Sequence, residues 1–507
     1  MILRMTSLVT FATILASAAA GQQHDDHGSG AGEHLGRVHF VTTCSPTVSG
    51  RFDRAVALLH SFEFGSAIAG FHDVLAADST CALAYWGIAL SQWSNPMAAG
   101  KKPAAFLEQG RQAAQTATRL GSLYASPRER DWIDAAGQLF ADYRHTDQAT
   151  RVAAYERAMQ EIVSRYPADT EALIFHAIAL VAAAPPTDKT YSRQLEAGRI
   201  LEALWATQPD HPGLAHYIIH AYDVPPLASR ARAAAERYAA IAPSAPHALH
   251  MPSHIFTRLG LWQASIDANT RSLHAALSSG AFAEALHAAD YAMYARLQLG
   301  QDQEAKAILD TLPGLAARFD PSAITGAAPP SAGVFAIAAI PARWVLERHA
   351  WTEAAALEPH SSAYPHTEAM TYFARGLGAV HTGDLVNAHR AIDSLASIQR
   401  RLGANGETYW AEQVAIQQLG VQAWIDWAEH RPDDALAHMR QAADREDATE
   451  KNAVTPGPLA PARELFGDLL LELGRPAAAA VEYRASLERE PNRRHALLRL
   501  GRGASGN

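Results

Sequence analysis

The stretch ARELFGDLLLELGRPAAAAVEYRASLEREPN, residues 462–492, decides the fold class of this chain. Its apolar residues recur at spacings of three and four, which is the period of one face of an α-helix. Gly474 is placed to end a first helix and Pro491 a second one. Gly467 lies where the two helices would cross too closely for a side chain. The stretch therefore predicts a helix-turn-helix unit.

Similar units recur from about residue 49 onward, at intervals of roughly 34 to 42 residues, and β-strand alternation is absent. Three of them are centred on Gly260, Gly300 and Gly383. These segments resemble the tetratricopeptide repeat (TPR) consensus. The resemblance implies an all-α, TPR-like α-solenoid, a right-handed superhelix whose concave groove binds ligands or partners.

The N-terminus has the pattern of a secretory signal peptide. Arg4 supplies a positive charge, residues 8–16 form a short apolar run, and the small residues 18–20 form a cleavage site. We therefore expect a bacterial protein that is periplasmic or secreted.

Four segments are expected along the chain. Residues 1–20 form the signal peptide, and the polar residues 21–48 a disordered N-terminal segment. Residues 49–320 form an N-terminal TPR-like solenoid, and residues 321–507 a C-terminal one.

Charge and hydrophobicity exclude two classes of partner. The net charge is −9 and no Lys/Arg-rich run occurs, whereas nucleic-acid binding needs a basic stripe. The mature chain has no apolar run of about 18 residues, so we expect no membrane span.

The only two cysteines are Cys44 and Cys81. An even pair in an exported protein predicts a disulfide, which would contribute roughly 4 kcal/mol in the chain-entropy model. Two separate buried thiols are the alternative.

The most informative feature for function is a pair of segments that align without gaps. QPDHPGLAHYIIHAYD begins at residue 208 and APSAPHALHMPSHIFT at residue 242, an offset equal to the TPR period of 34 residues. The alignment pairs four histidines, His216 with His250 and His220 with His254.

By resemblance to the TPR family, these four histidines take the fifth and ninth helix positions, which face the groove. His247 and His287 take second positions in successive repeats, Asp290 a fifth position and Arg343 a ninth. We expect His287 to complete a metal set with the four paired histidines. His247, Asp290, Tyr294 and Arg343 are expected to bind the ligand.

The chemistry follows from the spacing. Residues i and i+4 lie on one helix face, so each HxxxH offers two nitrogens to one ion. Neutral imidazole is a common ligand of zinc, copper and iron. Asp290 could complete a His/carboxylate set, Asp290 or Tyr294 could act as acid or base, and Arg343 could hold an anionic group.

The sequence therefore predicts an exported TPR-like protein that binds a small molecule or peptide through a transition-metal site in its groove. A metal-dependent enzyme is the sharper form of this hypothesis, although no catalytic residue is identified. The alternative is a metal-free scaffold for protein partners in the cell envelope. A metal carrier without catalysis is a third class.

Overall fold

The computed structural model describes residues 32–98 and 100–504, and all regular secondary structure within these ranges is helical. From His34 onward the helices pack as one unit. The predicted signal peptide lies outside the described residues.

The helices have the following bounds: η1 Pro46–Val48, α1 Ser49–His60, α2 Phe64–Ala77, α3 Ala82–Trp93, α4 Ala104–Tyr124, α5 Pro127–Gln138, α6 Gln148–Arg165, α7 Thr170–Ala182, α8 Ser192–Trp205, α9 Pro212–Tyr222, η2 Ala228–Ala231, α10 Arg232–Ile241, α11 Pro246–His250, α12 Pro252–Arg258, α13 Trp262–Ser279, α14 Phe282–Leu299, α15 Asp302–Ala316, α16 Pro330–Leu346, α17 Trp351–Ala355, α18 Pro365–His381, α19 Leu385–Ala404, α20 Thr408–Ala428, α21 Pro432–Asp447, α22 Ala462–Glu472, α23 Pro476–Arg489 and α24 Arg494–Ala504.

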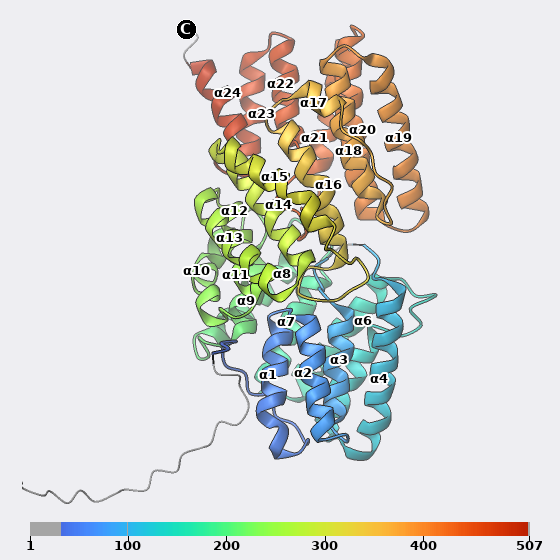
Figure 1. Ribbon diagram of the computed structural model, residues 1–507, viewed down its shortest axis with the longest axis vertical. Helices are drawn as coiled ribbons and strands as arrows, with labels where there is room; N and C mark the ends of the chain where they lie inside the picture. Colours follow the sequence, from blue (N-terminus) through green and yellow to red (C-terminus); the bar gives the residue numbers. More distant parts are fainter. Residues whose placement is uncertain (1–31, 99, 505–507) are drawn as a thin grey trace, which may run out of the picture. The chain divides into compact units, whose positions relative to one another are not determined.

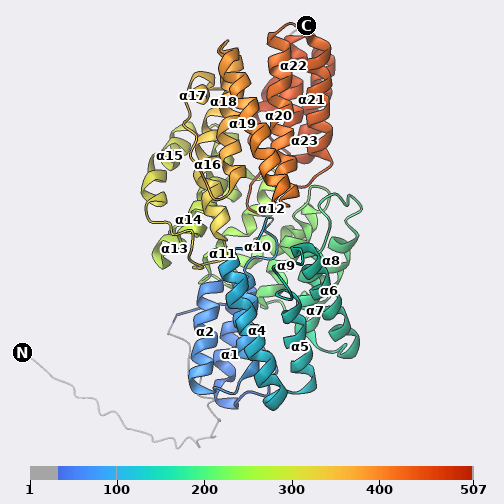
Figure 2. The same cartoon turned by 90° about the vertical axis from the view of Figure 1, so that its right-hand side faces the viewer.

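Consecutive helices lie side by side in chain order (Figures 1 and 2). α13 packs on α14, α18 on α19, α20 on α21, and α22 on α23. Each pair buries apolar faces that neither helix could bury alone, as expected for stacked repeats. The prediction of an all-α, TPR-like solenoid is confirmed. No helix within the described ranges has both the length and the apolar character needed to cross a membrane.

The last repeat shows how local sequence produces this packing. A Cβ atom on Gly467 of α22 would lie 2.5 Å from the ring of Tyr483 on α23, so only glycine permits the crossing. Gly474 ends the turn with a φ of +68°, a backbone conformation that favours glycine.

The apolar core has two large clusters. One is built mainly from residues 35–256 and the other mainly from residues 283–496. Of the six histidines grouped below, two lie on α9, two on α11, one on α12 and one on α14. The domain boundary at residues 320 and 321 stays a prediction.

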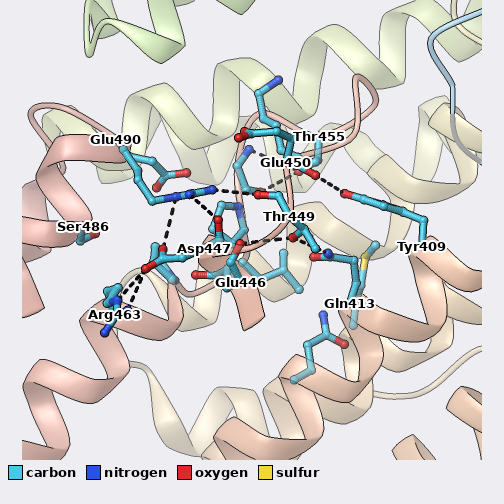
Figure 3. Close-up of a pocket in the computed structure, with 18 of the residues that line it drawn as sticks. Tyr409, Gln413, Glu446, Asp447, Thr449, Glu450, Thr455, Arg463, Ser486 and Glu490 are labelled. Atoms are coloured by element: carbon cyan, nitrogen blue, oxygen red, sulfur yellow. Dashed lines mark hydrogen bonds and ion pairs between the residues drawn. The ribbon is translucent and has the colours of Figure 1, made fainter. Parts of the chain in front are cut away.

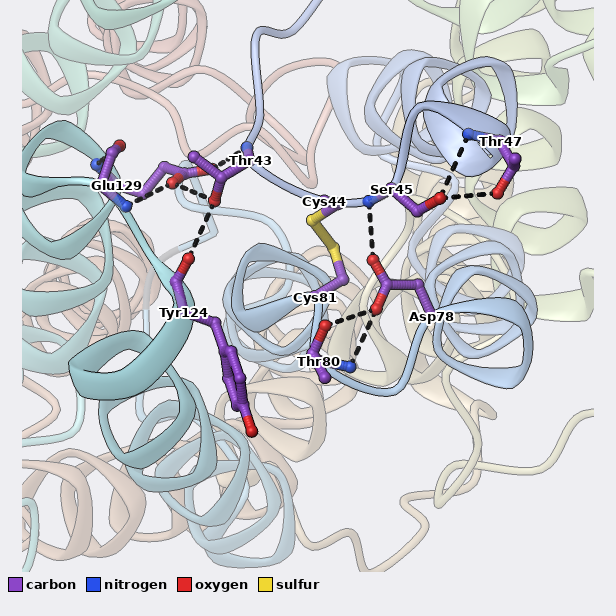
Figure 4. The surroundings of a disulfide bond; sticks show 10 residues. Thr43, Cys44, Ser45, Thr47, Asp78, Thr80, Cys81, Tyr124 and Glu129 are labelled. Carbon is purple, nitrogen blue, oxygen red and sulfur yellow. Dashed lines mark hydrogen bonds between the residues drawn. A yellow bond between two sulfur atoms is a disulfide. The ribbon is translucent and has the colours of Figure 1, made fainter.

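Residues 34–48 differ from the expected disordered segment. Phe40 is 3% exposed, and its ring contacts those of Trp86 and Trp132. Cys44 forms a disulfide with Cys81 at the start of α3 (Figure 4). This part of the segment is therefore ordered, because a buried aromatic ring and a covalent cross-link hold it against the helices. Composition alone did not show either contact.

Candidate metal centre

Six buried histidines from four helices gather in two groups of three. The first group is His216 and His220 of α9 with His247 of α11; the second is His250 of α11, His254 of α12 and His287 of α14. Within each group, one nitrogen of each ring lies within 4.8 Å of the others. Each group therefore has the geometry to hold a metal ion.

This grouping corrects the sequence interpretation in two respects. The four paired histidines do not surround one ion, because each HxxxH pair belongs to a different group. His247, expected to bind the ligand, is the third member of the first group. The reason is that the second position of one repeat lies beside the fifth and ninth positions of the preceding repeat.

The hydrogen bonds of the second group define where its protons lie. Asn269 donates its side-chain N–H to the carbonyl of Ser265, at 2.7 Å, so its Oδ1 atom must be an acceptor. His250 Nδ1 lies 2.6 Å from that oxygen and therefore carries the proton. His254 Nδ1 lies 2.9 Å from a carboxylate oxygen of Asp223, which also accepts.

In both His250 and His254 the proton is therefore on Nδ1, and the Nε2 atom is unprotonated and carries a lone pair. The Nε2 atoms of His250 and His254 face each other at 3.0 Å. Neither nitrogen can donate a hydrogen to the other while both rings are neutral. Two lone pairs at this separation repel each other, and a cation or a shared proton between them would remove the repulsion.

The rings are neutral because they are buried. Burial lowers the pKa of His250 to about 3 and that of His254 to about 4, although Asp223 opposes the shift of His254. Burial also raises the pKa of Asp223, but the nearby charges of Lys451 and Arg258 outweigh it and hold that pKa well below its ordinary value. An ionised carboxylate behind a neutral imidazole is the usual second-shell arrangement of a metal-binding histidine.

The first group has a similar arrangement. His216 donates from Nδ1 to the backbone carbonyl of His60 at 2.6 Å, and its Nε2 faces His220 Nε2 at 3.1 Å. His247 Nδ1 lies 3.1 Å from the carboxylate of Glu284, while its Nε2 is buried without a hydrogen-bond partner among the described residues. Here His220 could donate a proton to His216, so this group can satisfy itself more easily than the second.

Three residues predicted to bind the ligand have other contacts. Asp290 and Arg343 form a fully buried ion pair, with 2.7 Å between Oδ1 and Nε. Tyr294 accepts a hydrogen bond from Arg493 and donates one to Glu490. These side chains are therefore engaged inside the protein rather than lining an open groove, and Asp290 is absent from both histidine groups.

Besides Asp290, Arg343 also contacts the segment 449–458, which contains two prolines. This segment lies over the second group. Arg343 donates to the backbone carbonyl of Gly457 at 2.9 Å. Tyr291, whose ring contacts that of His254, donates to the carbonyl of Thr455 at 3.0 Å. Lys451 reaches Asp223 at 3.0 Å. This segment covers what the repeat pattern predicted to be an exposed groove, so the histidines are buried.

Two pockets flank this segment. One of about 120 Å³ is lined by His220, Asp223 and Lys451, so a single histidine of the first group borders it. The other, of about 90 Å³, lies among Tyr409, Arg463 and other polar side chains (Figure 3). The first pocket is the one that borders a histidine of these groups.

Two further clusters contain histidine. Glu171 lies between the Nε2 atoms of His60 and His211, at 2.9 and 3.0 Å, and so accepts a hydrogen bond from the Nε2–H of each ring. Asp468 is 3.0 Å from His495 Nε2 and 3.1 Å from the Arg499 guanidinium. A carboxylate already neutralises the donors in both clusters, which makes them weaker candidates for a metal.

The sequence interpretation missed the residues behind the imidazoles. Asp223 stands directly after the first aligned HxxxH pair, so its place in the motif was a usable signal. Asn269 and Glu284 lie on α13 and α14, and no pattern in the sequence associates them with the histidines.

Comparisons with known proteins show only distant similarity. No protein-family model matches the chain, and no curated protein matches it. Among solved structures it is similar to the APC/C hetero-tetramer Cut9–Hcn1, with 13% identity and a TM-score of 0.38 over 90% of this chain and 76% of that one. It is also similar to yeast Tom70 (11%, TM-score 0.38, 90% and 94%) and to the human IFIT1 dimer with m7Gppp-AAAA (10%, 0.37, 79% and 86%).

Proposed function

We propose that this chain is an exported helical-repeat protein that binds a transition metal through its buried histidines. The observation that carries the proposal is the His250–His254 pair. Both Nδ1 atoms are committed as donors, and the two Nε2 lone pairs face each other at 3.0 Å. A bound cation would turn this unfavourable contact into two coordinate bonds.

The donors indicate the class of metal. Each group offers imidazole nitrogens and neither includes a carboxylate or a thiolate. Calcium, magnesium and manganese prefer oxygen ligands, whereas imidazole suits zinc, copper and iron. Three ligands also leave one coordination position open, as in catalytic zinc sites. Such a position could bind water or a substrate, which is what a metal-dependent activity would need.

Metal analysis of the purified full-length chain tests the proposal. The protein is expressed with export, dialysed, and measured for metal content before and after chelator treatment and reloading with zinc or copper. We expect retained metal in the untreated protein and restored metal after reloading. A double variant, His220→Phe with His254→Phe, should hold none, because it removes a ligand from each group.

The matched control replaces two exposed histidines, His145→Phe with His389→Phe, and should retain metal. Circular dichroism checks that both double variants keep their helices. A wild-type chain that binds no zinc, copper or iron would refute the proposal, as would equal binding by the two double variants.

A metal-free scaffold for protein partners is the second candidate function. It is favoured by the helical-repeat fold, since such repeats present extended surfaces to other proteins. If this reading is right, chelation should leave capture of an envelope protein unchanged. If the metal reading is right, chelation should change the thermal stability of the isolated chain, because a ligand stabilises the state that binds it.

Export is tested independently of metal. The mature protein should begin near Gly21, and N-terminal sequencing of periplasmic material measures this directly. An intact Met1 would reject export while leaving the metal site untouched.

A further inference from the structure

The two histidine groups are built by the same rule. In each, the HxxxH pair of one repeat is joined by the histidine at the second position of the next repeat. His247 joins the pair of α9 in this way, and His287 joins the pair of α11 and α12. The first group thus corresponds to the second group one repeat further along the chain. Both groups offer three imidazole nitrogens, so an ion that binds the second group has the same kind of ligands in the first.

The donors of the first group are independently oriented. The carbonyl of His60 holds His216, and the carboxylate of Glu284 holds His247. Glu284 thus stands behind His247 as Asp223 stands behind His254. Each group has one carboxylate in its second shell, which offsets part of the charge of a bound ion.

A strained residue closes one side of the first group. Phe62, between α1 and α2, has a φ of +57°, a left-handed backbone conformation that strains a non-glycine residue. Its ring lies against those of His216, His220 and His247, at centroid distances of 4.4, 5.5 and 5.9 Å. The strained backbone therefore places an apolar ring on the imidazoles and excludes water from that side.

The two groups are neighbours without an intervening side-chain layer. The ring centroids of His220 and His254 are 6.2 Å apart, and those of His247 and His250 are 5.8 Å apart. Ions held in the two groups would consequently lie closer together than the spacing of two packed helices, about 8–10 Å.

We infer that the chain holds two transition-metal ions side by side, one in each histidine group, as a paired centre built from three successive repeats. This inference rests on the proposed metal-binding function. His220 of the first group lines a pocket together with Asp223 and Lys451, which would be the route by which an ion or substrate reaches that group. Copper is the probe of choice, because Cu(II) binds nitrogen ligands most tightly among the divalent first-row ions and is paramagnetic.

The first measurement is stoichiometry. The full-length, metal-free chain is titrated with copper and separately with zinc, and bound metal is counted after gel filtration. We expect two ions per chain. A single ion would overturn the paired centre and leave the proposed function standing, whereas no bound ion would overturn both.

Repeat-related variants assign the two ions. His220→Phe and His254→Phe replace equivalent ninth positions, so each variant should hold one ion and the double variant none. If His220→Phe still holds two ions, the first group is not a metal site. If either single variant loses both ions but keeps its helical circular dichroism, the groups are not separate sites and the inference fails.

The second measurement is proximity. Electron paramagnetic resonance of the chain loaded with two Cu(II) ions should show magnetic coupling, seen as a broadened or lost signal. Each single variant, with one ion, should show the sharp signal of an isolated Cu(II). Two sharp, uncoupled signals from the doubly loaded wild type would show that the ions are far apart and would reject the paired centre.

Discussion

The group of His250, His254 and His287 and the cluster of His60, Glu171 and His211 both consist of buried side chains with ligand atoms close together. In the second cluster a carboxylate lies between two imidazoles and is 2.9 and 3.0 Å from their Nε2 atoms. In the first, the only hydrogen-bonding atom that faces His254 Nε2 among the described residues is another imidazole nitrogen, His250 Nε2, at 3.0 Å.

The difference shows that a count of metal-ligating residues does not identify a metal site. What distinguishes the two clusters is which ring nitrogen carries the proton and which carries the lone pair. Around Glu171 every Nε2–H has an acceptor, and although burial raises the carboxyl pKa, the two histidines lower it to about 2. Around His254 the carboxylate lies behind the ring, so the lone pair is directed into the group. The same residue types thus form a satisfied ion cluster in one place and an oriented ligand set in the other.

The largest expected effect comes from removing a ligand. His254→Ala should weaken metal binding at the second group by more than about 100-fold, since loss of a second-shell residue alone costs 10- to 100-fold. His211→Ala should leave metal affinity unchanged. Competition with a chelator of known affinity measures both variants, and an equal loss in the two would abolish the distinction between the clusters.

The carboxylate cluster should instead matter for stability. Glu171→Gln should lower the free energy of unfolding by about 3 kcal/mol, because it removes the charge that two buried imidazole N–H groups share. Metal content should not change. Urea denaturation and metal analysis of the same sample provide the two readouts. Loss of metal from the still-folded variant would contradict this assignment.

A smaller effect on metal affinity is expected from Asp223, whose carboxylate holds the His254 ring in place. Asp223→Asn should weaken metal binding about 10- to 100-fold while the ligands remain in place, because the amide no longer fixes the His254 ring by its charge. Asp210→Asn, an exposed aspartate, is the control. Affinity is measured by chelator competition, and full affinity in Asp223→Asn would mean that the Asp223–His254 contact serves only folding.

The smallest effect concerns pH, and His366 provides a third kind of buried histidine. It stacks on Trp410 at 3.8 Å, neither ring nitrogen has a hydrogen-bond partner among the described residues, and burial lowers its pKa to about 3. The folded state therefore binds this proton less well than the unfolded state, so stability is lost as pH falls below about 6.5.

His366→Phe should remove about 1 kcal/mol of the stability loss between pH 7 and pH 5.5. Glu171 has its pKa lowered rather than raised, so its contribution is present above about 4.5 and is lost only toward pH 2. Glu171→Gln should not reduce the slope between pH 7 and pH 5.5, because burial lowers the pKa of His60, the Glu171 carboxylate raises it, and loss of that carboxylate makes the ring harder to protonate in the folded state. Urea midpoints at several pH values test both variants, and identical slopes for His366→Phe and wild type would contradict the His366 expectation.

The sequence by itself determined the helical-repeat fold and the position of the paired HxxxH segments. Both are periodic properties: apolar spacing specifies one helix face, and an offset of 34 residues specifies the same place in the next repeat. The repeat frame even placed His247 and His287 at equivalent positions. It did not show that each would join the pair of the preceding repeat.

Only the tertiary structure decided which groups meet and which protons they carry. Asp290 and Arg343 were predicted to face the groove, yet they bind each other, and Arg343 also binds the segment 449–458, which is distant in sequence. Asn269 orients His250 from another helix. These outcomes depend on contacts between elements that no local period encodes. A helical period predicts the helix face on which a side chain lies. The tautomer of a histidine and its hydrogen-bond partner depend instead on the atoms that other helices and loops place against that face.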